Sequence, residues 1–554
     1  MAEQFSQVSA VPRAPLRRLL DPWSLVAVAI SALVLMPILS VAWLAVTPEE
    51  NIWPHLISTT LPRYLANTGL LMAGVALLSA SVGTGAAWLI AMYRFPFARW
   101  LEWLLLLPLA IPAYVGAYAL VDFLEYAGPV QTGMRALFGW QSAQDYAFPE
   151  IRSRGAAVIV LSAALYPYVY LLARTAFREQ SGCAYEVARA LGAGPLALFL
   201  RVGLPLARPA IAAGSAIVMM ETVNDFGVVD YFAVQTLTTG IFSVWLQGGN
   251  AGGAAQIATL ILGMVLALVA LEKVSRRNLR FHNLGRHHRP LVPVALRGWA
   301  GWAAMLACLV PFAAGFVLPV GVIAAHALAN ADAWADPGLI RALGNTLMVG
   351  GLAAFGTVAA GLLLVYGVRL SGRSLPRLLL PVTTIGYAAP GAVLGVGLLI
   401  PMAAADNALA DTAERLFGVD IGLVMTGSAF AIIYAYGVRF FAIAQGAADA
   451  AMGRITPSLP MAARSLGRTA GGTLTAVYLP MIRASVGTAL LLVFVDCVKE
   501  LPATLLLRPF NFNTLATRVY DKASLENIGD AAPAALLVIA VGLVAVGLLA
   551  RANR

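Results

Sequence analysis

Long apolar segments recur along the whole chain and constrain its fold more than any other feature. Hydrophobic residues make up 60% of the 554 positions and charged residues only 12%, which is far outside the composition of soluble domains. A helix of about 20 apolar residues crosses a bilayer. We therefore expect an all-α polytopic membrane protein, and the composition excludes a secreted disulfide-linked protein or a disordered one.

Twelve segments are long enough to cross the bilayer, and polar or charged residues bound each of them. Prolines in the third and ninth segments, at Pro108, Pro112, Pro381 and Pro390, predict kinks. The first segment is too long for the hydrophobic region of a cleaved signal peptide, so we expect it to be retained. The predicted spans are residues 22–46, 66–92, 101–124, 155–177, 209–231, 253–272, 299–326, 342–368, 376–403, 421–446, 484–507 and 531–550.

Basic residues are concentrated on one side of this predicted topology. The two termini and the loops that follow even-numbered spans carry most of the 37 lysines and arginines, but few of the 27 acidic residues. By the positive-inside rule, both termini are cytoplasmic. The net charge of +10 therefore reflects topology and contact with lipid headgroups, and nucleic-acid binding is not expected.

Short motifs repeat between the two halves of the chain. Asn67 recurs as Asn345, each followed by threonine, and Pro112 recurs as Pro390 at the same displacement. Since six spans follow six spans in the same orientation, we expect a fused duplication whose halves are related by an axis along the membrane normal. The expected divisions are a first repeat at 1–272, a basic cytoplasmic linker at 273–297 and a second repeat at 298–554.

A longer pair of motifs lies in two predicted cytoplasmic loops. Residues 188–192 return at 463–467, and residues 204–208 return at 479–483, so the gap between the two motifs is identical in both halves. The first loop predicts a short amphipathic helix that ends near Gly192. Such a helix lies either on lipid headgroups or in a groove of a partner, and two copies at matched spacing favour the partner.

These loops resemble the cytoplasmic EAA loop of permease subunits of binding-protein-dependent ABC importers. The resemblance implies docking into a cleft of a cytoplasmic ABC ATPase homodimer. Two departures are Met461 where the family usually has Glu, and Val187 where it has Ala, so the second loop is expected to couple more by packing than by charge. The matching residues are Glu186, Ala188, Arg189, Gly192, Leu204 and Pro205 in loop 183–208, and Met461, Ala463, Arg464, Gly467, Leu479 and Pro480 in loop 458–483.

Catalytic signatures are missing from the sequence. It contains no G-x-x-x-x-G-K-[ST] phosphate-binding loop, and its five histidines form no nucleophilic grouping. We therefore expect no enzymatic activity and no cofactor on this chain. By the resemblance, ATP and Mg bind to the separate ATPase subunit.

Four acidic residues within predicted spans lie in register across the repeat. Glu221 and Asp225 align with Asp496 and Glu500 at the same displacement as the loop motifs. The members of each pair stand at i and i+4, which predicts that they share one face of a helix. Because carboxylates in lipid are costly, we expect all four to line an outer, negatively charged vestibule on the path of a cation.

Capping and pairing with the adjacent Asn224 and Lys499 are the structural alternatives for these acids. Lys499 and Arg508 could neutralise the second pair, so the first pair is the stronger candidate. No metal site is assigned. A transient Fe(III) contact at Glu221 and Asp225 is the metal role that the pattern suggests.

Residues 221–245 and 498–517 are similar to segments of the fused ferric-iron permeases of bacterial inner membranes. That resemblance implies a type I ABC importer fold and a periplasmic binding protein that delivers Fe(III). It also implies that residues 238–245 meet the binding protein or gate the vestibule, whereas the plain alternative is a short amphipathic packing helix.

Two other functions stay open at the level of sequence. A fused thiamine permease would also have twelve spans, two such loops and acids for a cationic cargo. A proton-coupled secondary transporter would use intramembrane acids as relays, but it has no reason to repeat the cytoplasmic loop.

Overall fold

The computed structural model describes residues 22–552, apart from residues 49, 278–291, 372–373, 385, 387–388 and 420. In this part of the chain, ten helices are long and apolar enough to cross a membrane, and two bent helix pairs raise the number to twelve. The all-α fold is thus confirmed, and the twelve predicted spans correspond to these ten helices and two bent pairs. Most of the basic linker at 273–297 lies outside the described residues.

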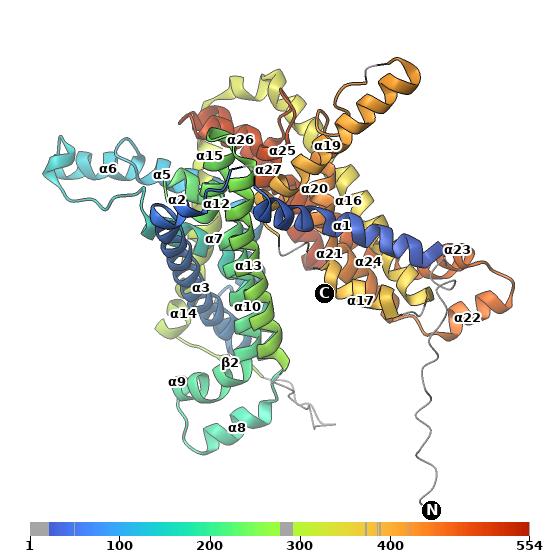
Figure 1. Cartoon of the computed structure of the whole chain (residues 1–554). Helices are drawn as coiled ribbons and strands as arrows, with labels where there is room; N and C mark the ends of the chain where they lie inside the picture. The colour runs from blue at the N-terminus through green and yellow to red at the C-terminus, as the bar shows by residue number, and fades with distance from the viewer. Residues whose placement is uncertain are drawn as a thin grey trace, which may run out of the picture.

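The first half forms an upright bundle built around α3, α7 and α10 (Figure 1). Two-residue strands β1 (Tyr93–Arg94) and β2 (Val294–Ala295) form a small parallel pair beside it. Its helices are α1 (Pro22–Val46), α2 (Trp53–Ser58), α3 (Leu61–Met92), α4 (Ala98–Leu104), η2 (Leu107–Ala110), α5 (Ala113–Leu124), α6 (Pro129–Phe138), η3 (Ala143–Asp145), α7 (Arg154–Arg178), α8 (Gly182–Ala190), α9 (Pro195–Leu198), η4 (Phe199–Gly203), α10 (Leu204–Asn224), α11 (Gly227–Tyr231), α12 (Leu237–Phe242), η5 (Ser243–Gln247) and α13 (Ala251–Arg277).

The second half forms a tilted bundle in which α16 packs against α21 and α24 (Figure 1). Its helices are α14 (Trp299–Phe312), η6 (Ala313–Val317), α15 (Leu318–Ala329), η7 (Ala331–Ala335), α16 (Pro337–Ser371), α17 (Ser374–Thr383), α19 (Gly391–Phe417), α20 (Phe430–Arg439), α21 (Phe441–Gly453), α22 (Ser458–Ser465), α23 (Ala470–Thr473), η8 (Leu474–Tyr478), α24 (Leu479–Lys499), α25 (Pro502–Leu507), α26 (Leu515–Ala523) and α27 (Ile528–Ala552).

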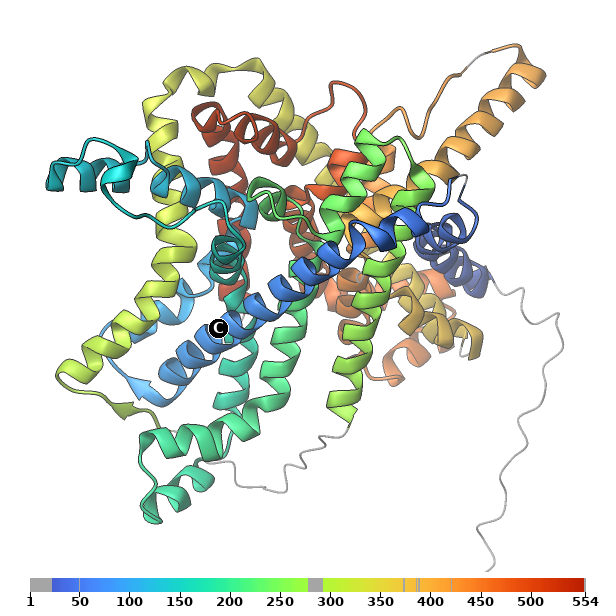
Figure 2. The same cartoon turned by 60° about the vertical axis from the view of Figure 1, so that its left-hand side comes forward.

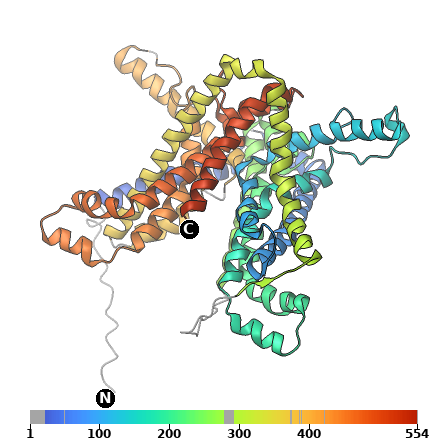
Figure 3. The same cartoon turned by 180° about the vertical axis from the view of Figure 1, so that it is seen from behind.

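The first span of each half packs on the other half. Helix α1 lies along α16 and α19, where Tyr434 Oη donates a 2.7 Å hydrogen bond to Leu33 O (Figure 1). Figure 2 shows α3 running diagonally across the front of the first half. Conversely, α15 packs against α5, and the view from behind shows α14 and α15 beside the first bundle (Figure 3). The two repeats of the sequence are therefore interlocked in space.

The Asn-Thr motif has the same structural role in both halves. Asn67 Nδ2 donates to Gln235 O at 2.8 Å, and Asn345 Nδ2 donates to Asn513 O at 2.9 Å. The hydroxyl of the following threonine accepts the backbone N–H of Leu237 in the first half and of Leu515 in the second. The motif thus ties the long helices α3 and α16 to the first turns of α12 and α26.

Several predicted spans are broken helices. The chain bends by 95° before α5 and by 50° between α20 and α21. Pro112 and Pro390 immediately precede α5 and α19, at helix starts where the missing N–H costs no helical hydrogen bond. The predicted breaks in the third and ninth spans are confirmed, whereas the bend between α20 and α21 was not predicted. The predicted continuation of helix through 225–231 and 500–501 is wrong.

Candidate substrate cavity and docking loops

A cavity of about 180 Å³ lies where broken helices of the two halves meet. Its walls come from η2, α5, α7, α10 and α11 in the first half, and from α20, α24 and α25 in the second. All four acidic residues predicted from the repeat line this cavity. The prediction that they lie together therefore agrees with the structure, although their role in transport stays a prediction.

Asp225 and Glu500 are helix caps. Each follows the last residue of a long helix and has an extended backbone. Asp225 Oδ1 accepts the N–H of Val228 at 2.9 Å, and Glu500 Oε1 accepts the N–H of Ala503 at 3.2 Å. The prediction that the members of each pair share one helical face is wrong, because a carboxylate that caps the next short helix stands outside the first helix.

Glu221 and Asp496 stay on their long helices, α10 and α24. Both are half-buried and line the cavity. Glu221 is close enough to Asp496 and Glu500 to be repelled by their charges, and close enough to Arg439 and Lys499 to be attracted. Glu221 and Asp496 are therefore the two acidic residues of this group that line the cavity without capping a helix.

Two basic side chains balance part of this negative charge. Arg439 Nε forms a 2.9 Å ion pair with Glu500 Oε2, and both side chains are almost fully buried. Lys499 Nζ donates a 2.8 Å hydrogen bond to Leu109 O in the other half. Arg439 was missed by the sequence reasoning, although an arginine inside the predicted tenth span was a signal for it.

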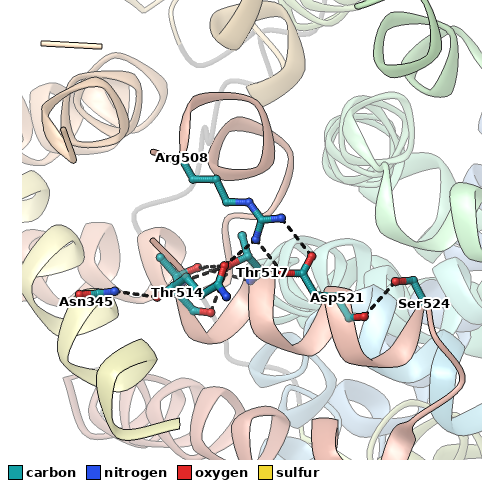
Figure 4. A network of polar contacts seen from close by, with 7 residues as sticks. Asn345, Arg508, Thr514, Thr517, Asp521 and Ser524 are labelled. Carbon is teal, nitrogen blue, oxygen red and sulfur yellow. Dashed lines mark hydrogen bonds and ion pairs between the residues drawn. The ribbon is translucent and has the colours of Figure 1, made fainter. Parts of the chain in front are cut away.

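Arg508 does not neutralise the second acid pair. Its guanidinium donates to Asp521 at 2.8 and 3.1 Å and to Asn513 Oδ1 at 2.7 Å (Figure 4). This network holds the start of α26, where Thr514 and Thr517 form a capping box. The idea that Arg508 could serve Glu500 is thereby corrected.

The carboxylates are not arranged as a preformed metal site. Within the described residues, no group of three or more His, Cys, Asp or Glu side chains could hold a metal ion. A transient Fe(III) contact at Glu221 and Asp225 stays a prediction.

Both loops that carry the repeated motifs fold as a short helix, a glycine turn and a return. Gly192 has φ +83° and Gly467 has φ +81°, the left-handed region that glycine adopts freely. Each glycine follows the end of a short helix. The residue after the glycine donates its N–H to the carbonyl five positions back, which is Ala188 O in the first loop and Ala463 O in the second. This pattern is the Schellman motif, and it explains why the glycine recurs at the same spacing.

Exposed apolar side chains surround each glycine turn. The two helical hairpins project from the ends of the two bundles, at α8 and α9 and at α22 and α23 (Figure 1). Glu186, Arg189 and Arg464 are also exposed. The exposed apolar side chains include Val187 (60%), Leu191 (82%), Leu196 (69%), Met461 (65%) and Leu466 (85%).

The returning arm of each hairpin leads directly into a long helix. Pro205 and Pro480 stand second in α10 and α24, each preceded by leucine and by one wide π turn. A proline has no N–H for the helical ladder, and the wide turn accommodates this loss. The two Leu-Pro motifs thus couple each hairpin mechanically to a helix that lines the cavity.

Residues 238–245 form a packed element. Thr238 Oγ1 donates to Val223 O at 2.7 Å, and Phe242 stacks on Phe226 with ring centroids 3.7 Å apart. Thr238, Ile241 and Phe242 are buried. This geometry supports the packing alternative over an exposed contact surface.

Comparisons with known proteins connect these features to a family. The model of the binding-protein-dependent transport system inner membrane component family matches residues 82–280. The chain is 24% identical to the Fe(3+)-transport system permease protein FbpB 2 of Haemophilus influenzae, over 86% of this chain and 87% of that protein.

Shorter permeases match about one third of the chain. The molybdenum transport system permease protein ModB of Mycobacterium tuberculosis is 31% identical over 36% of this chain and 73% of its own length. The sulfate transport system permease protein CysT of Salmonella typhimurium is 28% identical over 36% of this chain and 71% of its own length. With ten apolar spanning helices and two bent helix pairs in its described part, and with two repeated helical hairpins, the chain belongs to the family of binding-protein-dependent transport system inner membrane components.

Proposed function

We propose that this chain is the membrane permease of an ATP-driven importer that moves ferric iron from a periplasmic binding protein into the cytoplasm. The observation that carries the proposal is the similarity to an Fe(3+)-transport permease along nearly the whole length of both chains. The shorter relatives named above match only about one third of this chain.

The charge of the cavity supports a cationic cargo. Four carboxylates and two basic side chains line it, so the fully ionised wall is net negative. Such a wall attracts cations and repels anions through the low-dielectric interior. The cavity therefore favours ferric iron over an oxyanion as the species that passes.

Two copies of a cytoplasmic ABC ATPase are the proposed energy source. The chain carries two hairpins with matched glycine turns and exposed apolar side chains, one for each copy. We expect ATP and Mg to bind to these partners, and we expect no enzymatic activity or cofactor on this chain. Glu186 in the first hairpin and Met461 in the second give the two contacts different chemistry.

A bacterial inner membrane with both chain termini in the cytoplasm is the proposed setting. The native cysteines provide a test, since Cys183 in α8 is exposed while Cys308 and Cys497 are buried. An impermeant thiol reagent should label Cys183 in inverted vesicles and leave intact spheroplasts unlabelled. Labelling from outside the spheroplasts would invert the topology.

The direct test is transport by the reconstituted complex. Proteoliposomes that contain this chain, its ATPase and the binding protein should take up labelled ferric iron when ATP is supplied, and labelled thiamine or molybdate should stay outside. Uptake of thiamine without iron would restore that alternative. Uptake of iron that needs a proton gradient and no ATP would indicate a secondary transporter.

A further inference from the structure

The internal repeat is broken at two positions of the cavity wall. At the displacement that relates the two cytoplasmic loops, Arg439 corresponds to Ala164 and Lys499 corresponds to Asn224. All four residues line the cavity. The acids are thus present in both halves, whereas the cations occur only in the second.

The packing of two glycines confirms this register. A Cβ on Gly83 would lie 2.9 Å from the backbone N of Tyr170, and a Cβ on Gly361 would lie 3.1 Å from the backbone N of Gln445. Tyr170 and Gln445 are related by the same displacement as the two loops. Ala164 and Arg439 each lie six residues before these positions, on α7 and on α20, so the same displacement makes them equivalent.

Two uncharged polar groups beside the acids also point to a ligand. Asn224 and Tyr114 line the cavity, and each is more than nine-tenths buried. Asn224 Oδ1 and Tyr114 Oη have no hydrogen-bond partner within the described protein. Buried polar atoms are almost always paired, so these two indicate a site that is completed by water or cargo.

The two cations are tied to different halves. Arg439 Nε pairs with Glu500 Oε2 at 2.9 Å, a contact between α20 and the end of α24 within the second half. Lys499 reaches across to Leu109 O, at the break of the third span in the first half. Arg439 therefore neutralises the capping carboxylate of Glu500. Lys499 lies between the two halves, near Glu221 and Asp496.

We propose that Arg439 and Lys499 are resident cations that shorten the stay of a multivalent cation in the cavity. The inference rests on the proposed import of ferric iron. Four carboxylates alone would hold a trivalent ion strongly, because each opposite charge attracts it through a medium of low dielectric. A passage must bind its cargo well enough to admit it and weakly enough to release it.

Substitutions that make the halves alike test this role. Lys499→Asn gives the second half the residue of the first, and Asn224→Lys does the reverse while both natural cations stay in place. The control is Arg369→Gln, which removes a positive charge that pairs with Asp449 outside the cavity. The complete complex with its ATPase, in nanodiscs without nucleotide, is loaded with Tb³⁺, and its luminescence is followed after addition of a chelator.

Lys499→Asn should retain Tb³⁺ at least about tenfold longer than the unsubstituted complex, since one repelling charge near a trivalent ion is lost. Asn224→Lys should release it faster by a similar factor, and Arg369→Gln should leave the release rate unchanged. Lys499→Asn should also slow ATP-driven iron uptake. Lys499→Gln repeats the test with a longer side chain if Lys499→Asn does not assemble.

If Tb³⁺ binding depends on the four acids but release from Lys499→Asn is unchanged or faster, the proposed role of the cations is overturned and the proposed pathway stands. If Tb³⁺ binding is unchanged after all four acids are neutralised, the proposed pathway and this inference are both overturned. The two failures are thus distinguished by the behaviour of the acid variants.

Discussion

The two halves of the molecule share a scaffold and differ in charge. Asn67 and Asn345 make the same hydrogen bond, and Gly192 and Gly467 make the same turn. Yet the cavity wall of the first half has no base where the second half has Arg439. The two halves thus share the hydrogen bonds and turns that set their helix ends, as well as the acidic residues of the cavity wall, and they differ in the basic residues of that wall.

The largest effect should come from breaking the element that the halves share most closely. Gly192→Val with Gly467→Val forces a β-branched residue into the left-handed region twice, at about 1–2 kcal/mol each. We expect loss of ATPase copurification and a fall of iron uptake to background. Gly194→Val with Gly471→Val is the control, because both positions have open space and neither has a positive φ. Normal copurification of the first variant would refute the docking role.

A smaller effect should separate the halves at the cavity wall. Gly391 and Ala113 are equivalent, but a Cβ on Gly391 would lie within van der Waals overlap of Glu500 Oε1. Gly391→Ala should displace this carboxylate from Arg439 and cost about 3 kcal/mol of unfolding free energy, as expected for a disturbed buried ion pair. Ala113→Gly should cost less than about 1 kcal/mol. Denaturant unfolding in detergent compares them, and equal losses would contradict the proposed clash.

The halves should respond alike at the Asn-Thr motif. Thr68→Val and Thr346→Val each leave one buried backbone N–H, of Leu237 or of Leu515, without its acceptor. We expect a loss of about 1–3 kcal/mol for either variant, measured as a shift in the unfolding midpoint. A loss in one half only would show that the shared scaffold is not energetically equivalent.

The smallest effect concerns an ion pair that only the second half has in these positions. Arg518 donates to Asp336 at 2.5 Å and lowers the pKa of this carboxyl below its usual value. In the first half, Gly240 and Ser58 occupy the positions equivalent to Arg518 and Asp336. Because this pKa is lower in the folded than in the unfolded protein, ionised Asp336 stabilises the fold at pH values above the unfolded pKa near 4. The stabilisation is lost as the pH falls through the folded pKa. Since Asp336 is partly exposed, the contribution is below about 1 kcal/mol.

Asp336→Asn should therefore lower the melting temperature slightly at pH 7, and the difference from the unsubstituted protein should vanish near pH 3. The measurement is thermal unfolding in detergent at both pH values. A difference that grows on acidification would contradict the assigned direction of the pKa shift.

Much of the fold could be predicted from local patterns. Apolar length indicated the twelve spans, and the displacement of short motifs indicated the duplication and the glycine turns. The sequence prediction missed the helix ends at Asn224 and Lys499, although Gly227 and Pro502 two residues beyond the capping acids were break signals. The capping hydrogen bonds of Asp225 and Glu500 form only in the folded chain.

The long-range partners were equally hidden from sequence. The crossing of α1 onto the second half depends on the fit of apolar surfaces that local hydropathy does not distinguish. The pairing of Arg439 with Glu500 joins two spans that are far apart along the chain. A charged residue in a span indicates a partner, but its identity comes only from the packed structure.

ATP-driven iron uptake by two acid variants tests the central claim most directly. Glu221→Gln with Asp225→Asn removes the acids of the half that has no resident cation, and Asp496→Asn with Glu500→Gln removes those of the other half. With equal membrane levels and ATPase association, the first variant should lose at least about tenfold in uptake, and the second should lose less, because Arg439 and Lys499 already balance its acids. Unimpaired uptake in both variants would contradict the claim that ferric iron passes through this cavity.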